Sequence, residues 1–248
     1  IQPLLTENPN SLKLSGKYIS NDDVTIICNY QGMKNVRILD LTDNQISDDA
    51  LPVLFESDNL AQIEELYLGI NFLIGQGLID IASSTQIKMK NLKTLVISDN
   101  RLTDPSVAEF MRSENFPNLE SLDVGWNEVG NETAKSLGQI TSFPGLKILN
   151  MDRSYIEVEA LKEMVQGSLM EQLQELDLSA NKLKDEGVKV LALAPKWKAL
   201  KQLRLSQNMF GDEGAKALGE SVMLGGLTHL YAGRNYFENE GAKAIHES

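Results

Sequence analysis

The sequence predicts an α/β solenoid in which parallel strands line one face and helices cover the other. One observation is that the segment from Leu92 to Leu102, LKTLVISDNRL, recurs along the whole chain. The other is that each copy is followed by apolar residues spaced three and four apart, which is typical of a helix with one buried face. Self-similarity at a fixed period of about 20–50 residues indicates stacked repeats. We therefore expect about nine repeats of 27 residues.

The repeats are evenly spaced. They start near residues 9, 36, 63, 92, 119, 146, 173, 200 and 227, and one interval of 29 residues interrupts the regular 27. We expect the two extra residues after the helix of the third repeat, around residues 83–90. Residues 1–248 are treated as a single domain. Because the chain starts without Met and stops inside the pattern, we expect it to be a piece of a longer protein.

The first half of each repeat has the pattern of a short strand. Leucines at its fourth and sixth positions alternate with polar residues, so they point into the core while their neighbours point outward. An asparagine recurs at the ninth position, where its amide can donate to and accept from backbone groups at the strand end. Ser154 and Lys17 interrupt this ladder, whose members are Asn44, Asn71, Asn100, Asn127, Asn181, Asn208 and Asn235.

The second half predicts a helix. Ala215, Leu218 and Gly219 lie on one helical face, and acidic residues precede them near the expected helix start. Cys28 occupies an equivalent buried slot, which predicts a core residue and not a reactive thiol.

A strand, an asparagine turn and a helix at 27 residues resemble the ribonuclease-inhibitor-like class of leucine-rich repeats, including the GALA-type variants. The phrases Asp185-Glu186-Gly187 and Asp212-Glu213-Gly214 are especially similar, and the resemblance extends from Leu12 to Ile245. It implies a horseshoe with strands on the concave face and helices on the convex face. Relatives include inhibitors, immune sensors, GTPase-activating proteins and ubiquitin-ligase adaptors, so the class does not specify a function.

The amino-acid composition limits the classes of partner that the protein is expected to bind. The chain has 35 acidic and 23 basic residues, a net charge of −12, which disfavours nucleic acid and anionic membranes and is more compatible with a protein carrying a basic patch. One cysteine and two histidines leave no disulfide and no zinc cluster, so we expect no metal, no cofactor and a cytoplasmic location. Nothing in the pattern defines the oligomeric state.

No nucleophile motif accompanies either histidine, so we expect no catalytic residues and no enzyme activity. Two alternatives stay open. A GTPase-activating protein of the Ran type could use Arg101 or Arg153, and a ubiquitin-ligase adaptor would need an F-box outside this sequence. Asp48 is interpreted as a solvated position, and Asn115, outside the ladder, is expected to matter less for stability than Asn127.

The predicted function is therefore a non-catalytic scaffold that binds another protein on the concave face. The third and fifth positions of each repeat point to that face, and the eighth and tenth lie on its rim. Large aromatic residues and arginine dominate interface hot spots. Acids concentrate in the early repeats and basic residues in the last two. The predicted contact residues are Tyr67, Ile70, Phe72, Trp126, Arg153, Tyr155, Arg204, Tyr231, Arg234, Tyr236, Asp40, Asp43, Asp99 and Asp123.

Overall fold

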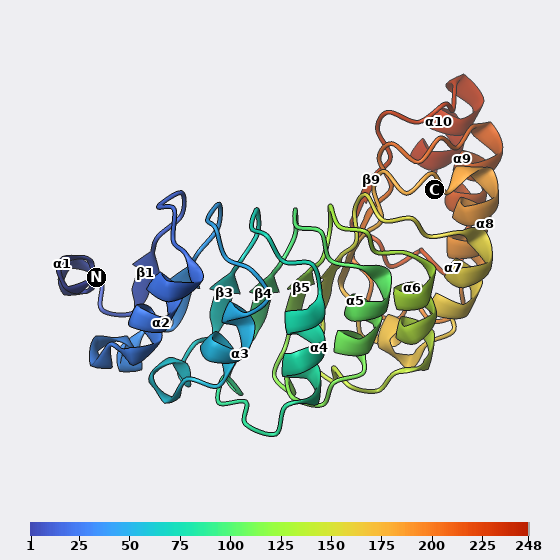
Figure 1. Ribbon diagram of the computed structural model, residues 1–248. Helices are drawn as coiled ribbons and strands as arrows, with labels where there is room; N and C mark the ends of the chain where they lie inside the picture. The colour runs from blue at the N-terminus through green and yellow to red at the C-terminus, as the bar shows by residue number, and fades with distance from the viewer. Residues whose placement is uncertain (248) are drawn as a thin grey trace.

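Each repeat forms one rung, a strand followed by a turn and a helix, in the computed structural model, which describes residues 1–247 (Figure 1). Across this range the strands form a single nine-stranded sheet in sequential order, and every neighbouring pair is parallel. The strands are β1 (Ser11–Lys13), β2 (Ile38–Asp40), β3 (Glu65–Tyr67), β4 (Thr94–Val96), β5 (Ser121–Asp123), β6 (Ile148–Asn150), β7 (Glu175–Asp177), β8 (Gln202–Arg204) and β9 (His229–Tyr231).

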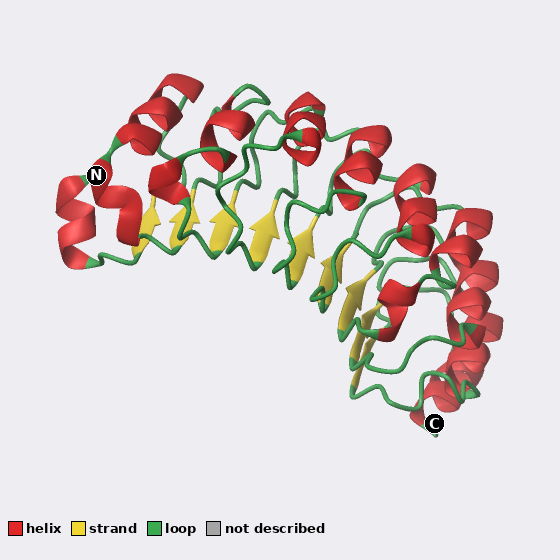
Figure 2. Cartoon of the chain, turned by 90° about the horizontal axis from the view of Figure 1, so that it is seen from below, coloured by secondary structure: helices red, strands yellow, loops and turns green. Residues whose placement is uncertain are grey.

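The helices lie on the outside of an arc whose inside is the sheet, as Figure 2 shows. This α/β leucine-rich-repeat solenoid is the architecture that the repeat pattern predicted. The helices are α1 (Gln2–Glu7), α2 (Asn21–Asn29), α3 (Ala50–Phe55), α4 (Gln76–Ser83), α5 (Asp104–Met111), α6 (Asn131–Gln139), α7 (Val158–Met164), α8 (Lys184–Leu193), α9 (Asp212–Gly219) and α10 (Asn239–His246), with short 3-10 turns at η1 (Gln31–Asn35), η2 (Asp58–Leu60) and η3 (Ser168–Glu171). None of the helices in residues 1–247 is long and apolar enough to cross a membrane.

The register follows the leucine frame. Leu39 pairs with Leu66 across β2 and β3, and the central leucine of each strand pairs in the same way along the whole sheet. The paired leucines are 27 residues apart, except Leu66 and Leu95 of β3 and β4, which are 29 apart. The extra residues lie after α4, in the loop that ends where the Met89 N–H donates to the Phe55 carbonyl. This is the region expected from the sequence.

One continuous core fills the space between sheet and helices. The central leucines of β1 to β8 are fully buried, and behind the sheet Phe110 packs on Phe116 and Phe143 with ring centroids 5.1 and 5.9 Å apart. Cys28 is buried as predicted, and burial raises the pKa of its thiol to about 11. The two ends differ. Leu12 of the first strand is fully buried near the short helix α1, whereas Leu230 of the last described strand is only half-buried.

Asparagines at the ninth position join neighbouring rungs. The Asn127 amide donates to the carbonyls of Ile97 and Val124, both at 3.0 Å, and its Oδ1 accepts from the Leu102 N–H at 3.0 Å. At the interruption, the side-chain oxygens Ser154 Oγ and Asn181 Oδ1 are buried with no hydrogen-bond partner among the described residues. Amide donation to the preceding rung recurs at Asn44, Asn71, Asn100, Asn181, Asn208 and Asn235.

Asn115 makes similar contacts on the other side of the molecule. Its side-chain amide donates to the carbonyls of Ile81, Ala82 and Ser84 at 2.8–3.1 Å. Two of these carbonyls belong to the last turn of α4, where carbonyl groups lack partners within the helix. The expectation that Asn115 matters less than Asn127 rested on its lying outside the ladder, and that basis needs correction, because Asn115 caps the C-terminal end of a neighbouring helix.

A second correction concerns Asp48, which is not simply solvated. Its carboxylate accepts from the backbone N–H groups of Ile74, Gly75 and Gly77, at 2.9 Å each, so it caps the start of α4 in the next rung. Asp104, Asp185 and Asp212 cap α6, α9 and α10 in the same way.

These inter-rung caps explain the Asp-Glu-Gly phrases. A Cβ at Gly214 would lie 2.8 Å from Asp185 Oδ1, and one at Gly241 would lie 2.6 Å from Asp212 Oδ1. The carboxylate of one rung therefore needs a glycine in the next rung, so that the backbone N–H can approach it closely.

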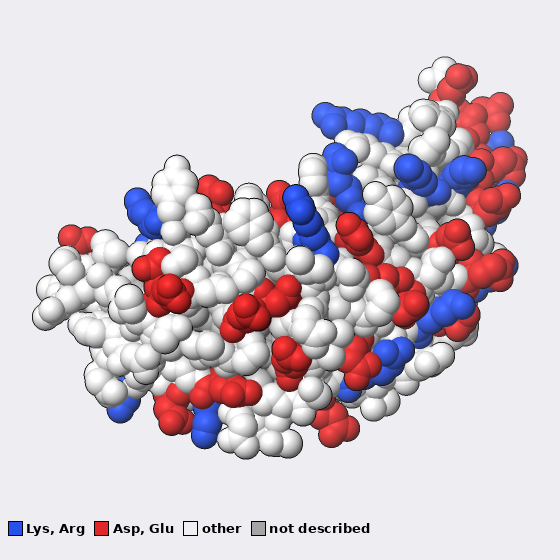
Figure 3. Space-filling model, in the orientation of Figure 1, with Lys and Arg blue, Asp and Glu red and all other residues white. Residues whose placement is uncertain are grey.

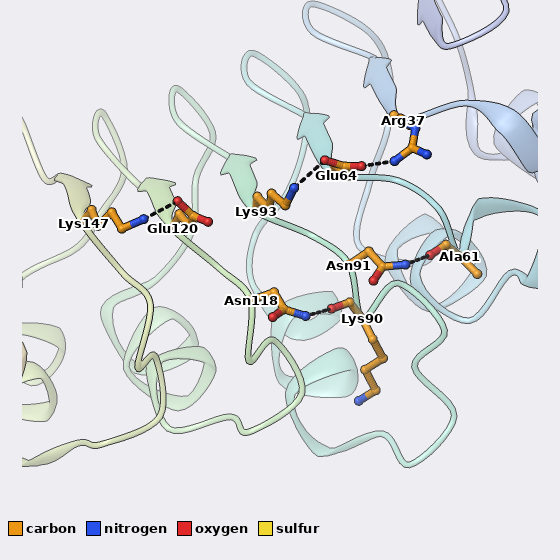
Figure 4. A network of polar contacts seen from close by, with 9 residues as sticks. All are labelled: Arg37, Ala61, Glu64, Lys90, Asn91, Lys93, Asn118, Glu120 and Lys147. Atoms are coloured by element: carbon orange, nitrogen blue, oxygen red, sulfur yellow. Dashed lines mark hydrogen bonds and ion pairs between the residues drawn. The ribbon is translucent and has the colours of Figure 1, made fainter.

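Charged side chains join the rungs at the edge where the chain enters the strands (Figure 4). Glu64 lies between Arg37 and Lys93, with its Oε2 2.7 Å from Lys93 Nζ, and Glu120 Oε2 lies 2.7 Å from Lys147 Nζ. These contacts hold the pKa of the Glu64 and Glu120 carboxyls below the usual value, mainly through hydrogen bonds from the lysines. Exposed pairs of this kind each contribute little to stability.

Candidate protein-binding site on the concave face

Two adjoining hollows lie on the concave face. The larger, of about 390 Å³, brings together four predicted contact residues, Ile70, Asp99, Asp123 and Trp126. The smaller, of about 250 Å³, extends toward Arg204. Because the strands are parallel and in register, residues 27 or 29 apart in sequence lie side by side here. The two hollows share Val96, Asp123, Asn150 and Asp177.

Trp126 forms the rim of the larger hollow. Its indole Nε1 donates to Asp152 Oδ2 at 2.6 Å, and the Arg153 guanidinium carbon lies 3.7 Å from a ring centroid. The stacked arginine adds a cation–π contact. Even with these contacts, 47% of Trp126 is exposed, which is a large area for an aromatic side chain that the leucine frame does not require.

The backbone at this rim is left-handed. The eighth residue of each rung from β2 onward has a φ between +51° and +59°, a region in which Asp, Asn and Gly are most easily accommodated. Ile70 and Trp126 occupy it nonetheless, with φ of 55° and 54°. A β-branched residue is strained there, and such strain persists where the surrounding structure or a function maintains it.

The floor of the larger hollow is acidic. Asp123 accepts from the Gly125 N–H at 3.0 Å, and burial is the largest cause that raises the pKa of its carboxyl above the usual value. Burial likewise raises the pKa of Asp152, and the neighbouring charges of Asp177 and Asp123 add to it. Within residues 1–247, no Lys or Arg forms an ion pair with Asp99, Asp123 or Asp152. Negative charge is thus concentrated in a partly desolvated hollow, in which Asp177 is the one carboxylate that forms an ion pair among the described residues, with Arg204.

A second cluster lies at the C-terminal part of the face. The Arg204 guanidinium carbon lies 4.3 Å from the Tyr231 ring centroid, and Arg204 Nε lies 3.8 Å from Asp177 Oδ2. His229 stacks on Tyr231 with centroids 6.3 Å apart. Positive charge near the last strands therefore faces the acidic hollow along the sheet. On the side drawn in Figure 3, most basic side chains along the upper edge also lie over the C-terminal half.

The other predicted contact residues lie apart from these clusters. Tyr67 donates to Glu65 at 2.7 Å, Asp40 accepts from the Thr42 N–H, and Asp43 and Phe72 line a separate hollow with Tyr18. Along the rim, Tyr155 and Tyr236 are about two-thirds exposed at 68% and 67%, and Arg234 is exposed too.

Three residues near the site were not among the predicted contacts. Asp152 lies at a seventh position, which the strand alternation also turns outward, and Asp177 lies at a fifth position. Extending the alternation by one step would have found Asp152. Tyr18, which is exposed beside Phe72, belongs to the degenerate first repeat, so its position could be found only by aligning that repeat.

Groups suited to metal binding or catalysis do not converge in the described part of the chain. No cluster of three or more His, Cys, Asp or Glu side chains there could hold a metal ion. His229 Nδ1 lies 3.0 Å from Thr228 Oγ1 on the exposed surface, and Cys28 lies on the buried face of α2. The concave face instead presents aromatic side chains, carboxylates and two arginines that stack on aromatic rings, which are groups suited to contact with a partner.

Comparison with known proteins agrees with the repeat pattern. A family model described as Leucine Rich repeat matches residues 32–51, 88–111, 117–138, 172–192 and 199–219. The matched segments fall in five of the nine rungs and agree with the leucine-rich-repeat solenoid that the nine-stranded sheet forms. A search of curated proteins finds no significant match.

Two solved structures illustrate the fold. A chain of the yeast Rad7 and Elc1 complex is similar with a TM-score of 0.63 and 18% identity, over 91% of this chain and 56% of that chain. A chain of the Arabidopsis receptor kinase HAESA in complex with the peptide hormone IDA and the co-receptor SERK1 is similar with a TM-score of 0.55 and 23% identity, over 94% of this chain and 35% of that one. This chain thus spans about half or less of these proteins, and the likeness shows the shared fold alone.

Proposed function

We propose that this protein is a non-catalytic interaction scaffold that binds a partner protein on the concave face and its rim. The observation that carries the proposal is the exposed aromatic rim. Phe72, Trp126, Tyr155 and Tyr236 are 47–68% exposed at positions where packing does not require an aromatic side chain. Exposed apolar side chains that gather on one surface are typical of protein-binding sites.

Charge supports the same surface. Asp43 and Asp99 are exposed toward its N-terminal part, and Arg234 and His229 toward its C-terminal part. An electrically polar face favours one orientation of a charged partner during encounter. We also place the repeats in the ribonuclease-inhibitor-like class, because the 27-residue period and an α-helix in each of the nine described rungs are features of that class.

The test is affinity capture with matched variants, followed by direct titration of each captured protein. Trp126→Ala combined with Tyr155→Ala should weaken binding at least tenfold, since hot-spot aromatic residues each contribute about 2 kcal/mol or more. The matched control removes exposed apolar groups from convex helices, Ile26→Ala with Leu193→Ala, and should leave binding unchanged. If the control loses the partner and the rim variant keeps it, the binding surface is on the convex side.

Association kinetics provide a second test. Reversing Asp40, Asp43 and Asp99 to Lys should slow association with a basic partner by about tenfold at low salt and reduce its salt dependence, because these acids act by steering. Dissociation should change little. A large effect on dissociation with unchanged association would contradict this role.

A further inference from the structure

We propose that the acidic hollow beside Trp126 receives an arginine side chain of the bound partner. The inference rests on the proposed function, because it specifies the chemistry of one contact on the concave face. Ile70, Val96 and Trp126 form the walls of the hollow, and carboxylates lie at its floor. Its volume of about 390 Å³ is large enough for a long side chain.

The charge of the hollow indicates that its occupant is positively charged. Four carboxylates line one hollow, those of Asp99, Asp123, Asp152 and Asp177. Within residues 1–247 only Asp177 has a basic partner, Arg204 at 3.8 Å, so the negative charge exceeds the positive charge in contact with it. Charged groups taken out of water are normally paired, because desolvation is costly. Burial is the largest cause of the raised pKa values of Asp123 and Asp152, the neighbouring carboxylates add to it, and a cation in the hollow would lower both pKa values.

Shape selects a guanidinium over a metal ion or a lysine. The carboxylates do not converge as a set of metal ligands anywhere in the described chain. Trp126 already stacks on one guanidinium, that of Arg153, so its position on the rim suits planar cations. A guanidinium presents a fork of donors to carboxylates while its faces contact aromatic or apolar walls. An ammonium group would satisfy the acids but has no planar face to lie against the apolar wall at Val96.

The two tryptophans supply the assay. Trp126 has its indole N–H on Asp152, whereas Trp197 is buried with its indole N–H on the Leu191 carbonyl at 2.9 Å. Their indole signals in a ¹⁵N-edited spectrum therefore report on the hollow and on the core, respectively. The probe is N-acetyl-arginine amide, and the matched neutral probe is N-acetyl-citrulline amide, which has nearly the same shape without the charge. We expect the Trp126 signal to shift with a dissociation constant on the order of millimolar, as for any very small ligand.

Variants localise the effect. Asp123→Asn with Asp152→Asn should weaken arginine binding about tenfold or more, because charge-assisted hydrogen bonds are lost. The control Glu132→Gln with Glu186→Gln removes the same charge from exposed positions on α6 and α8 and should leave binding unchanged. Equal shifts with arginine and citrulline, no shift of Trp126, or equal loss in both double variants would overturn the inference.

Failure of this inference can be told apart from failure of the proposed function. If N-acetyl-arginine amide leaves Trp126 unchanged while the rim variant still loses the partner, the scaffold function stands and the arginine contact is wrong. If N-acetyl-arginine amide binds the hollow but no substitution on the concave face weakens partner capture, the proposed binding surface is wrong.

Discussion

Asn127→Leu should be among the most destabilising polar substitutions in the chain. Leucine has a similar volume but cannot form hydrogen bonds. The Ile97 carbonyl would keep a donor, because Asn100 also donates to it at 3.1 Å. The Val124 carbonyl and the Leu102 N–H would each lose the one partner seen in the described structure, since the next rung has Ser154 in place of an asparagine. Two buried backbone groups without partners, at roughly 1–3 kcal/mol each, lower the free energy of unfolding by about 2–6 kcal/mol.

The measurement is urea unfolding followed by circular dichroism, with hydrogen exchange of the Leu102 amide as the local readout. Asn239→Leu is a suitable control, because Asn239 is exposed and its side chain forms no hydrogen bond in the described structure. Asn115 is unsuitable because it caps α4. A loss below about 1 kcal/mol in the Asn127 variant, or unchanged protection of Leu102, would refute the ladder reasoning.

Three further predictions concern the fold and its titration. Gly214→Ala should lower the free energy of unfolding by about 1–3 kcal/mol, because its Cβ would displace the Asp185 cap, whereas Gly226→Ala, with 3.7 Å to the nearest atom, should not; equal thermal shifts would contradict this. The Cys28 thiol, with a pKa raised to about 11 by burial, should react with a disulfide reagent at pH 8 only as fast as the protein opens, and rapid reaction without urea would contradict its burial. Asp152→Asn should raise the melting temperature at pH 7 and have no effect near pH 3. Because the pKa of Asp152 is raised in the folded state, its ionisation destabilises the folded protein only at pH values above the usual pKa of 3.8. A lower melting temperature of the variant at pH 7 would contradict this sign.

Much of the fold was predictable because it depends on periodicity within one repeat. Leucines such as Leu95 and Leu122, spaced by one repeat, determine which residues enter the core and which strands pair. Contacts between rungs were harder to predict. Asp48 and Asn115 act on backbone groups 26–34 residues earlier or later, so their partners could be identified only once the rungs were stacked.

In the candidate site, too, positions within one repeat were predictable and contacts between rungs were not. Outward-facing positions such as Trp126 follow from strand alternation, but its contact with Asp152 depends on the exact register of two rungs and on the side-chain rotamers. The left-handed backbone at Ile70 and Trp126 could not be inferred from residue type, because these residues rarely adopt it. The sequence thus indicates the surface, and stacking determines which of its groups meet.

The two series of inter-rung contacts weaken at the same boundary. In the rung of β6, Ser154 interrupts the asparagine ladder, and Val158 stands where four other rungs have the capping aspartate, so α8 begins without a side-chain cap. Repeat proteins unfold as linked units whose coupling is set by nearest-neighbour contacts. We therefore expect the coupling between rungs to be weak here, between one cooperative unit up to about residue 157 and another from about residue 173. The acidic hollow lies on the first unit and reaches the second through Asp177. A partner bound there would join the two units and resist their separation under mechanical load.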